Sequence, residues 1–201
     1  ASKNRLSGKI GIYEMPELDL LKGKLYNGLG WNQQLVGRNS TALANLKIAL
    51  RHAEKANELR LKASVLNNMG VIYKRVLEFD SALYSYQHSL EIARNMKDNR
   101  LTRFSINNIG AVMLSLSRPS EAINYIQEGL ELNTAAQDTL ELINSYTNLG
   151  VAYMDLNNPA QAQPNLVKAI ALSDSLQNAS RKTPALYALA RLHAKEKDFK
   201  I

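Results

Sequence analysis

Three asparagines recur at one constant step along the sequence, at Asn68, Asn108 and Asn148. A carboxamide carries hydrogen-bond donors and an acceptor in one side chain, so a row of them can pair with the backbone of an extended peptide without reading its side chains. The competing interpretation is that each asparagine bonds a neighbouring helix and belongs to the fold. The equivalent position at the start of the row is Gly28, which interrupts it. Both interpretations stay open from the sequence.

Basic and aromatic side chains are the other candidates for ligand recognition. Lys24, Lys74 and Arg75 lie in the N-terminal half of the chain and favour an acidic peptide or a carboxylate. Charge along one helix face is more often simple solvation, which is the competing interpretation. Trp31 is the single tryptophan, and an exposed indole is a natural anchor in a binding surface. Alternatively, residues 1–15 fold back and cover it.

No catalytic or metal-binding pattern accompanies these residues. The chain has no cysteine, which excludes disulfides, thiolate nucleophiles and thiolate metal sites but leaves the cellular compartment open. His52, His88 and His193 share no ligand spacing, and no carboxylate stands at ligand spacing from them. Neither a nucleophile with a nearby base nor the paired carboxylates of a hydrolase can be recognised. We therefore predict a protein that is not an enzyme and that binds no cofactor and no metal.

The net charge is +7 and is unevenly distributed. Residues 21–103 carry 14 basic and 6 acidic side chains, whereas residues 104–180 carry 2 basic and 7 acidic ones. This asymmetry is either ordinary surface variation or a preference of the first half for acidic partners. Nucleic acid is not favoured, because the basic half lacks the interleaved aromatic residues of a stacking platform. No apolar run reaches the roughly 18 residues of a membrane-spanning helix, and residues 1–20 lack the pattern of a signal peptide.

A 40-residue period identifies the elements that must position these side chains. Four glycines mark it, at Gly30, Gly70, Gly110 and Gly150. Four alanines and four aliphatic residues keep the same step: Ala42, Ala82, Ala122, Ala162, Leu50, Leu90, Leu130 and Ile170. A fixed period of this length indicates stacked repeats, in which one repeat cannot bury its apolar face alone.

Each repeat should contain two helices, because apolar residues recur at spacings of three and four between turn-forming residues. The first helix of repeat one is predicted at about 16–35 and that of repeat two at about 60–77. The first helices of repeats three and four are predicted to end near 116 and 156. The second helices are predicted to end near 57, 96, 136 and 176. In the first repeat, the second helix should be capped by Asn39 or Ser40. In the second repeat, the second helix should be capped by Asp80 or Ser81.

Prolines refine these helix starts. Pro16, Pro119 and Pro159 fit the first helical turn, where a missing N–H costs nothing. Pro164 predicts a late start or a kink in the second helix of the fourth repeat. Thr183-Pro184 is expected to open the first helix of a fifth repeat. The chain stops where the next helix should begin, so we expect a truncated array.

These repeats resemble the tetratricopeptide repeat. The resemblance rests on Leu66-x-x-Met69-Gly70-x-x-Tyr73, on the equivalent segment from Tyr146 to Tyr153, and on Ala82-x-x-x-Tyr86. The closing proline of the family is absent and the period is 40 rather than 34, which lengthens the helices. The resemblance implies an all-α, right-handed superhelical solenoid of antiparallel helix pairs, in which the glycines let paired helices approach. Repeats are expected at about 16–58, 59–98, 99–138 and 139–178, with a partial fifth at 179–201 and an irregular or partly helical segment at 1–15.

Such long repeats are similar to those of kinesin light chains and bacterial regulators, including Rap-type peptide receptors. The resemblance implies that the first helix of each pair lines a concave groove. The expected groove residues are Asn68, Asn108, Asn144, Asn148, Trp31, Lys24, Lys74 and Arg75. We predict a non-catalytic scaffold in a larger bacterial regulatory protein, binding an extended peptide or a partner helix. The alternative is a Rap-like regulator whose superhelix compacts on binding a peptide.

Overall fold

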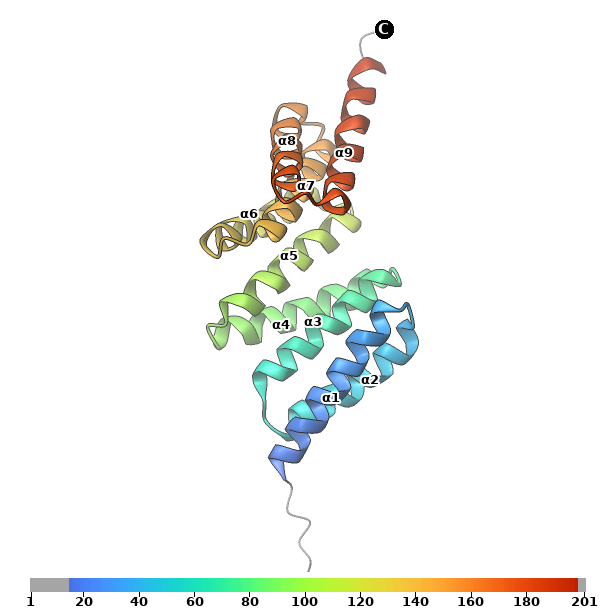
Figure 1. Ribbon diagram of the computed structural model, residues 1–201, viewed down its shortest axis with the longest axis vertical. Coiled ribbons are helices and arrows are strands. Elements are labelled where there is room, and N and C mark those ends of the chain that lie inside the picture. Colours follow the sequence, from blue (N-terminus) through green and yellow to red (C-terminus); the bar gives the residue numbers. More distant parts are fainter. Residues whose placement is uncertain (1–14, 199–201) are drawn as a thin grey trace, which may run out of the picture.

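The computed structural model describes residues 15–198 of the chain, and every regular element in that range is an α-helix (Figure 1). In chain order the helices are α1 (Pro16–Leu35), α2 (Asn39–Lys55), α3 (Leu59–Arg75), α4 (Phe79–Asn95), α5 (Asn99–Ser115), α6 (Pro119–Ala135), α7 (Thr139–Asp155), α8 (Pro159–Ser175) and α9 (Ala179–Asp198). Within this range no helix combines the length and the apolar character that crossing a membrane requires. The prediction of an all-α fold is confirmed.

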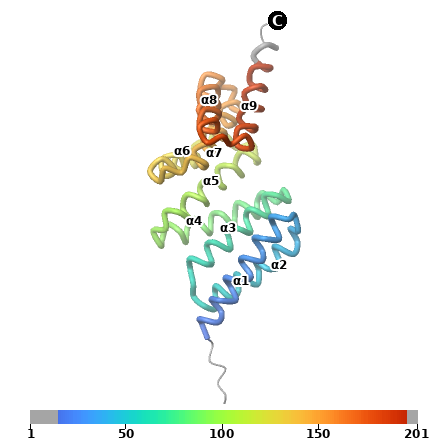
Figure 2. Tube along the Cα trace, in the orientation of Figure 1, coloured from blue at the N-terminus to red at the C-terminus, as the bar shows by residue number. Residues whose placement is uncertain are grey.

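Each helix packs against the next one in the chain, and the odd-numbered helices also contact one another. α1 contacts α3, α3 contacts α5, α5 contacts α7 and α7 contacts α9, whereas the even-numbered helices of the described part make no such contacts. The odd-numbered helices therefore line the inner side of a curved array. Figures 1 and 2 show the resulting solenoid, with α1 at one end and α9 at the other. The predicted solenoid of helix pairs is confirmed, while residues 1–14 lie outside the described part.

The connections between helices recur at a regular step along the chain. Positions 37, 57, 77, 97, 117, 137, 157 and 177 all have positive φ, and Gly37 is the single glycine among them. At each connection this residue donates its N–H three residues back and the next residue donates five residues back, as from Leu77 to Lys74 and from Glu78 to Tyr73. This Schellman arrangement satisfies the last carbonyls of a helix. The same turn thus joins helices within a repeat and between repeats.

Because of this turn, the N-caps of α2 and α4 differ from the predicted ones. Their N-caps are Arg38 and Glu78, and neither side chain makes a capping hydrogen bond. The residue after the left-handed position is already the N-cap of the next helix, so the turn sets the helix start and side-chain preference does not. Asp98, Asp138 and Asn158 occupy the same place in later turns and do cap their helices. The predictions that Asn39 or Ser40 caps α2 and that Asp80 or Ser81 caps α4 are therefore wrong.

Two predicted helix starts near prolines are also wrong. α8 begins at Pro159, so the late start expected from Pro164 is wrong, while the alternative, a kink at Pro164, stays a prediction. α9 begins at Ala179, so Thr183-Pro184 does not open it. Both interior prolines lie in the second turn, where each removes one backbone hydrogen bond without ending the helix. The turns centred on positions 157 and 177 set both starts. The first-turn positions of Pro119 and Pro159 are confirmed.

The motif glycines bring paired helices together. A Cβ atom on Gly70 would lie 2.6 Å from the ring of Tyr86, and one on Gly150 would lie 2.4 Å from the side chain of Leu166. The other two motif glycines are crowded in the same way. The repeat alanines are fully buried: Ala42, Ala82, Ala122 and Ala162. The predicted packing role of the glycines is confirmed.

Candidate functional site

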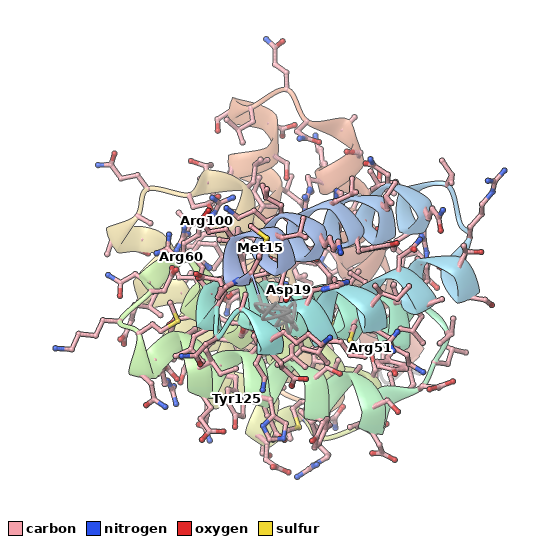
Figure 3. The ribbon with its side chains drawn as sticks, turned by 90° about the horizontal axis from the view of Figure 1, so that it is seen from below. Met15, Asp19, Arg51, Arg60, Arg100 and Tyr125 are labelled. Carbon is pink, nitrogen blue, oxygen red and sulfur yellow. The ribbon has the colours of Figure 1, made fainter. Side chains whose placement is uncertain are left out.

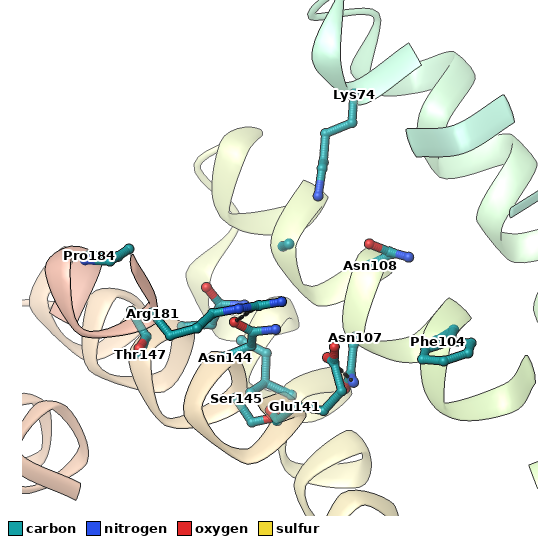
Figure 4. A pocket seen from close by; sticks show the side chains of 13 residues that line it. Lys74, Phe104, Asn107, Asn108, Glu141, Asn144, Ser145, Thr147, Arg181 and Pro184 are labelled. Atoms are coloured by element: carbon teal, nitrogen blue, oxygen red, sulfur yellow. Dashed lines mark hydrogen bonds between the residues drawn. The ribbon is translucent and has the colours of Figure 1, made fainter. Parts of the chain in front are cut away.

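Two adjoining cavities lie on the inner side of the array. The first has a volume of about 630 Å³ and is bordered by α1, α3 and α5, with Trp31, Asn68 and Arg100 among its lining residues. The second has a volume of about 410 Å³ and is bordered mainly by α3, α5, α7 and α9 (Figure 4). Phe104 and Asn108 border both cavities. The two cavities therefore form one continuous site, called here the inner groove.

The asparagine row ties neighbouring inner helices together. The Asn68 side chain donates to Oδ1 of Asn27 at 2.9 Å, and the Asn108 side chain donates to Oδ1 of Asn67 at 3.3 Å. These bonds match the structural interpretation of the row. Each of these amides still has a second N–H and its own carbonyl oxygen, and both residues border the inner groove. Asn148 borders the second cavity.

A buried polar network lies behind the second cavity, where α5, α6 and α7 meet. Asn133 is fully buried; its Oδ1 accepts from Arg103 at 3.1 Å, and its Nδ2 donates to Ser145 at 3.1 Å and to Asn107 at 3.3 Å. The Asn107 amide in turn donates to Glu141 at 3.0 Å. Buried polar groups must be paired in this way, because an unpaired one costs its full desolvation energy. The network holds Asn107 and Glu141 at the cavity wall.

Two cations approach the second cavity from different walls. Lys74 reaches in from α3 and Arg181 reaches in from α9 (Figure 4). Burial lowers the pKa of Lys74, and the negative charge of Glu141 opposes that shift. Arg181 donates to Oδ1 of Asn144 at 2.6 Å, which fixes the guanidinium near the cavity. The arrangement presents positive charge and amide groups to whatever enters.

The first cavity is partly aromatic. Trp31 is 42% exposed on α1 and lines it. The Arg100 guanidinium lies 5.5 Å from the centre of the Phe104 ring, a cation–π distance. Arg60 pairs with Asp98 at 2.8 Å. This part of the groove suits an apolar or aromatic side chain.

Two of the sequence-predicted residues lie outside both cavities. Lys24 is exposed on α1. Arg75 donates to the backbone carbonyl of Gln34, near the C-terminal end of α1, and so stabilises that helix end. The structure thus brings together Asn68, Asn108, Asn144, Asn148, Trp31 and Lys74 in the inner groove, and leaves Lys24 and Arg75 outside it.

Several groove residues escaped the sequence reasoning although a signal existed. In the register of the repeats, Leu61 and Leu101 are followed by Glu141 and Arg181, so the apolar pattern breaks where the second cavity forms. A second row with the same spacing lies one residue before the predicted row and comprises Asn27, Asn67 and Asn107. Asn27 and Asn67 accept from Asn68 and Asn108, whereas Asn107 bonds Glu141 and Asn133.

No group of three or more acidic, histidine or cysteine side chains within residues 15–198 is placed to hold a metal ion. The comparisons with known proteins concern the repeats themselves. A family model described as Tetratricopeptide repeat matches residues 61–135, and a second of the same description matches residues 143–175, which together exceed half of the chain. No curated protein sequence matches the chain.

Solved structures share the fold at low sequence identity. Rap protein complexed with Competence and Sporulation Factor is 17% identical, with a TM-score of 0.77 over 90% of this chain and 51% of its own. Aspartyl phosphate phosphatase F from Bacillus subtilis is 12% identical, with a TM-score of 0.74 over 90% of this chain and 50% of its own. MamA, from residue 41 to its end, from Desulfovibrio magneticus RS-1 is 18% identical, with a TM-score of 0.60 over 88% of this chain and 96% of its own.

The chain spans about half the length of the first two of these structures. At such identities the likeness concerns the fold and carries no activity with it. The two family models and the shared solenoid together show that the chain belongs to the tetratricopeptide repeat family.

Proposed function

We propose that the chain is a non-catalytic interaction scaffold whose inner groove binds an extended, acidic segment of a partner protein. The observation that carries this proposal is the second cavity, where Lys74 and Arg181 approach from different walls among amide side chains. A carboxylate suits such a place, because hydrogen bonds between a charged donor and a charged acceptor are the strong ones. Glu141 faces the same space but is already bonded by Asn107.

The groove offers a separate role to each kind of side chain. The second N–H and the carbonyl oxygen of Asn68 and of Asn108, together with the Asn148 amide, are offered to the backbone of an extended ligand. Trp31 and Phe104 offer apolar surface to one of its side chains. The Rap neighbour was solved with Competence and Sporulation Factor bound, so this fold accommodates a bound factor in at least one relative. Because another neighbour is a phosphatase, the absence of catalysis is part of the proposal.

The test is a pull-down from native lysate with four baits. They are the wild type, Lys74→Ala/Arg181→Ala, Asn68→Ala/Asn108→Ala and the control Lys47→Ala/Arg51→Ala, which removes two cations from the outer helix α2. We expect the wild type and the control to hold the partner and the Lys74→Ala/Arg181→Ala bait to lose it. Circular dichroism must show that all four baits remain helical. Recovery of one partner by all four baits would place its binding outside the groove.

The asparagine variant separates the two roles of the row. If the amides grip the ligand backbone, Asn68→Ala/Asn108→Ala loses the partner while its thermal midpoint stays close to that of the wild type. If they serve mainly to join α1, α3 and α5, the midpoint falls and partner capture follows the folded fraction. Measuring both quantities on the same preparation distinguishes these outcomes.

A second candidate is a ligand-responsive regulator that compacts when the groove is filled. It is favoured by the position of Lys74 on α3 and Glu141 on α7, because both border the second cavity and form no ion pair with each other in the described part. A tighter superhelix would bring them together. Small-angle scattering should then show that the radius of gyration of the array falls when the captured partner binds. The fall should be smaller in the Glu141→Gln variant than in the wild type. An unchanged radius contradicts this candidate and leaves the scaffold proposal intact.

A further inference from the structure

The two cavities of the inner groove occupy the same place in successive repeats. Most residues that line the first cavity have a counterpart 40 positions later that lines the second, as Asn68 has in Asn108 and Asn108 has in Asn148. Val71 of the first cavity corresponds in the same way to Ala111 of the second. The second cavity is therefore the first one moved by a single repeat along the array.

The chemistry of the two cavities differs although their place in the repeat is the same. Leu101 and Phe104 of the first cavity are followed 40 positions later by Glu141 and Asn144 in the second. The asparagine row continues through both cavities. An extended chain in the groove would thus offer its backbone to the same amides at both places, while its side chains would meet an apolar wall at one and a polar wall at the other.

The first cavity suits an aromatic side chain. Trp31 and Phe104 present ring surface to it. Arg60 and Arg100 stand near the starts of two neighbouring inner helices, which Figure 3 shows from the α1 end of the array. Both guanidinium groups are already engaged, because Arg60 pairs with Asp98 at 2.8 Å and Arg100 lies 5.5 Å from the centre of the Phe104 ring. A ring from a ligand can extend this stack.

The second cavity has room for one negative charge. Lys74 and Arg181 bring two positive charges to it and Glu141 brings one negative charge, so that one positive charge is left over (Figure 4). A single carboxylate balances that charge, whereas a doubly charged group such as a phosphorylated side chain would exceed it. The guanidinium of Arg181 is held in place by Asn144 at 2.6 Å.

The distance between the two cavities corresponds to a short stretch of an extended ligand. Neighbouring inner helices contact each other, as α3 does with α5 and α5 with α7. The axes of packed helices lie about 8–10 Å apart, and an extended chain advances by about 3.3 Å per residue. One step from an inner helix to the next therefore equals about three residues of the ligand.

On the basis of the proposed function, we propose that the partner segment carries an aromatic residue and an acidic residue three positions apart. The aromatic ring enters the first cavity, and the carboxylate enters the second between Lys74 and Arg181. The amides between them pair with the ligand backbone. Because a carboxamide both donates and accepts, this arrangement serves either direction of the ligand chain.

Trp31 provides the measurement, because it is the single tryptophan and lines the first cavity. The probes are blocked nonapeptides of serine and glycine that contain one phenylalanine and one glutamate, at positions i and i+1, i+3 or i+6, in both orders. Their affinities for residues 1–201 follow from titration of the tryptophan fluorescence. In at least one order, we expect the i+3 peptide to bind at least about tenfold more tightly than the i+1 and i+6 peptides.

Two further comparisons assign the residues of the peptide to the cavities. Exchanging the glutamate of the i+3 peptide for glutamine should weaken binding to the wild type at least about tenfold and change little in Arg181→Ala. The matched control is Arg191→Ala, which removes an exposed arginine of the same helix that lies outside both cavities and should keep the full preference for glutamate. Circular dichroism should show that both variants are folded. Exchanging the phenylalanine for a second glutamate should also weaken binding.

The possible results separate this proposal from the proposed function. Equal affinity at all three spacings overturns the spacing, but the proposed function stands if that affinity is lost in Lys74→Ala/Arg181→Ala. Tighter binding of the peptide with two glutamates overturns the aromatic assignment of the first cavity. Binding that responds neither to glutamine in the peptide nor to Arg181→Ala contradicts both proposals. If no peptide binds, the spacing proposal falls and the pull-down decides the proposed function independently.

Discussion

Replacing a glycine of the inner helices with alanine should have opposite effects on the free energy of unfolding at Gly150 and at Gly28. Replacing Gly150 with alanine should lower the free energy of unfolding by about 1–3 kcal/mol, because the new methyl group would overlap Leu166 of the paired helix. Replacing Gly28 with alanine should raise it by about 0.5–1 kcal/mol, because nothing lies near the added atom. Urea denaturation at a concentration where the chain is monomeric measures both. Equal effects would show that crowding does not explain the motif glycine.

A tyrosine beneath one motif glycine leaves a polar atom unpaired. Tyr86 is fully buried, and its hydroxyl has no hydrogen-bond partner in the described part of the chain. Tyr86→Phe should therefore raise the free energy of unfolding at neutral pH by about 1 kcal/mol. Tyr84→Phe, on the exposed side of α4, is the control and should change it by far less. A loss of stability in Tyr86→Phe would mean that the hydroxyl is bonded in solution.

The same residue makes the fold sensitive to alkaline pH. Burial raises the pKa of Tyr86 well above 10.0. Between the unfolded and folded pKa values only the unfolded chain releases the proton, so stability is fully present below pH 10 and falls as the pH rises above it. The slope from this one group reaches about 1.4 kcal/mol per pH unit. Thermal unfolding from pH 9 upward should show this slope in the wild type and in Tyr84→Phe, and a shallower one in Tyr86→Phe.

Among the elements, the connecting turn contains avoidable strain. Leu77 has φ of +64° and Gly37 has φ of +79° in the same turn. A left-handed conformation costs a residue with a Cβ atom about 1–2 kcal/mol. Leu77→Gly should raise the free energy of unfolding by about 0.5–1 kcal/mol, since the added freedom of the unfolded chain offsets part of the gain. The mirror change Gly37→Leu should lower it, and chemical denaturation of the two variants would contradict the argument if both moved the same way.

One buried asparagine adds polar contacts from α6 to both α5 and α7. Asn133→Ala would leave Arg103, Asn107 and Ser145 without a partner they have in the folded chain. The free energy of unfolding should fall by about 2–3 kcal/mol, the cost of burying unpaired polar groups. Asn95→Ala, at an exposed place near the end of α4, is the matched control and should change it by about 0.5 kcal/mol or less. Similar losses in both variants would show that the network is not what holds these helices.

Helix number and order could be predicted from the sequence, because a regular apolar period leaves few other ways to bury the apolar faces. The starts of α2, α4 and α9 could not. The turn places Leu77, Lys97 and Ser117 in a left-handed conformation that their side chains do not favour. Close packing of consecutive helices overrides that local preference. Side-chain rules for capping therefore missed the starts of α2 and α4.

At the scale of the whole molecule, part of the groove was within reach of sequence reasoning. Asn68 and Asn108 follow from the period and from the resemblance to known repeats. Lys74, Asn144 and Asn148 of the second cavity were predicted as well, but Glu141 and Arg181 were not, because they come from α7 and α9 and reach the space beside Lys74 only through the curvature of the array. Curvature depends on how successive repeats pack, and no local pattern encodes it directly. The partner of Arg75, a backbone carbonyl on α1, is equally invisible to a sequence pattern.

The uniform turn has a consequence for how such a chain can change length. Because every connection has the same conformation and the same hydrogen bonds, a duplicated helix pair can be spliced in at any of them without creating a new kind of junction. A single helix with its turn would also join smoothly, but every helix after it would exchange the inner side for the outer side. The surface that faces a ligand would then be cut in two. Growth and loss in this architecture are therefore tolerated in steps of helix pairs and penalised in steps of single helices.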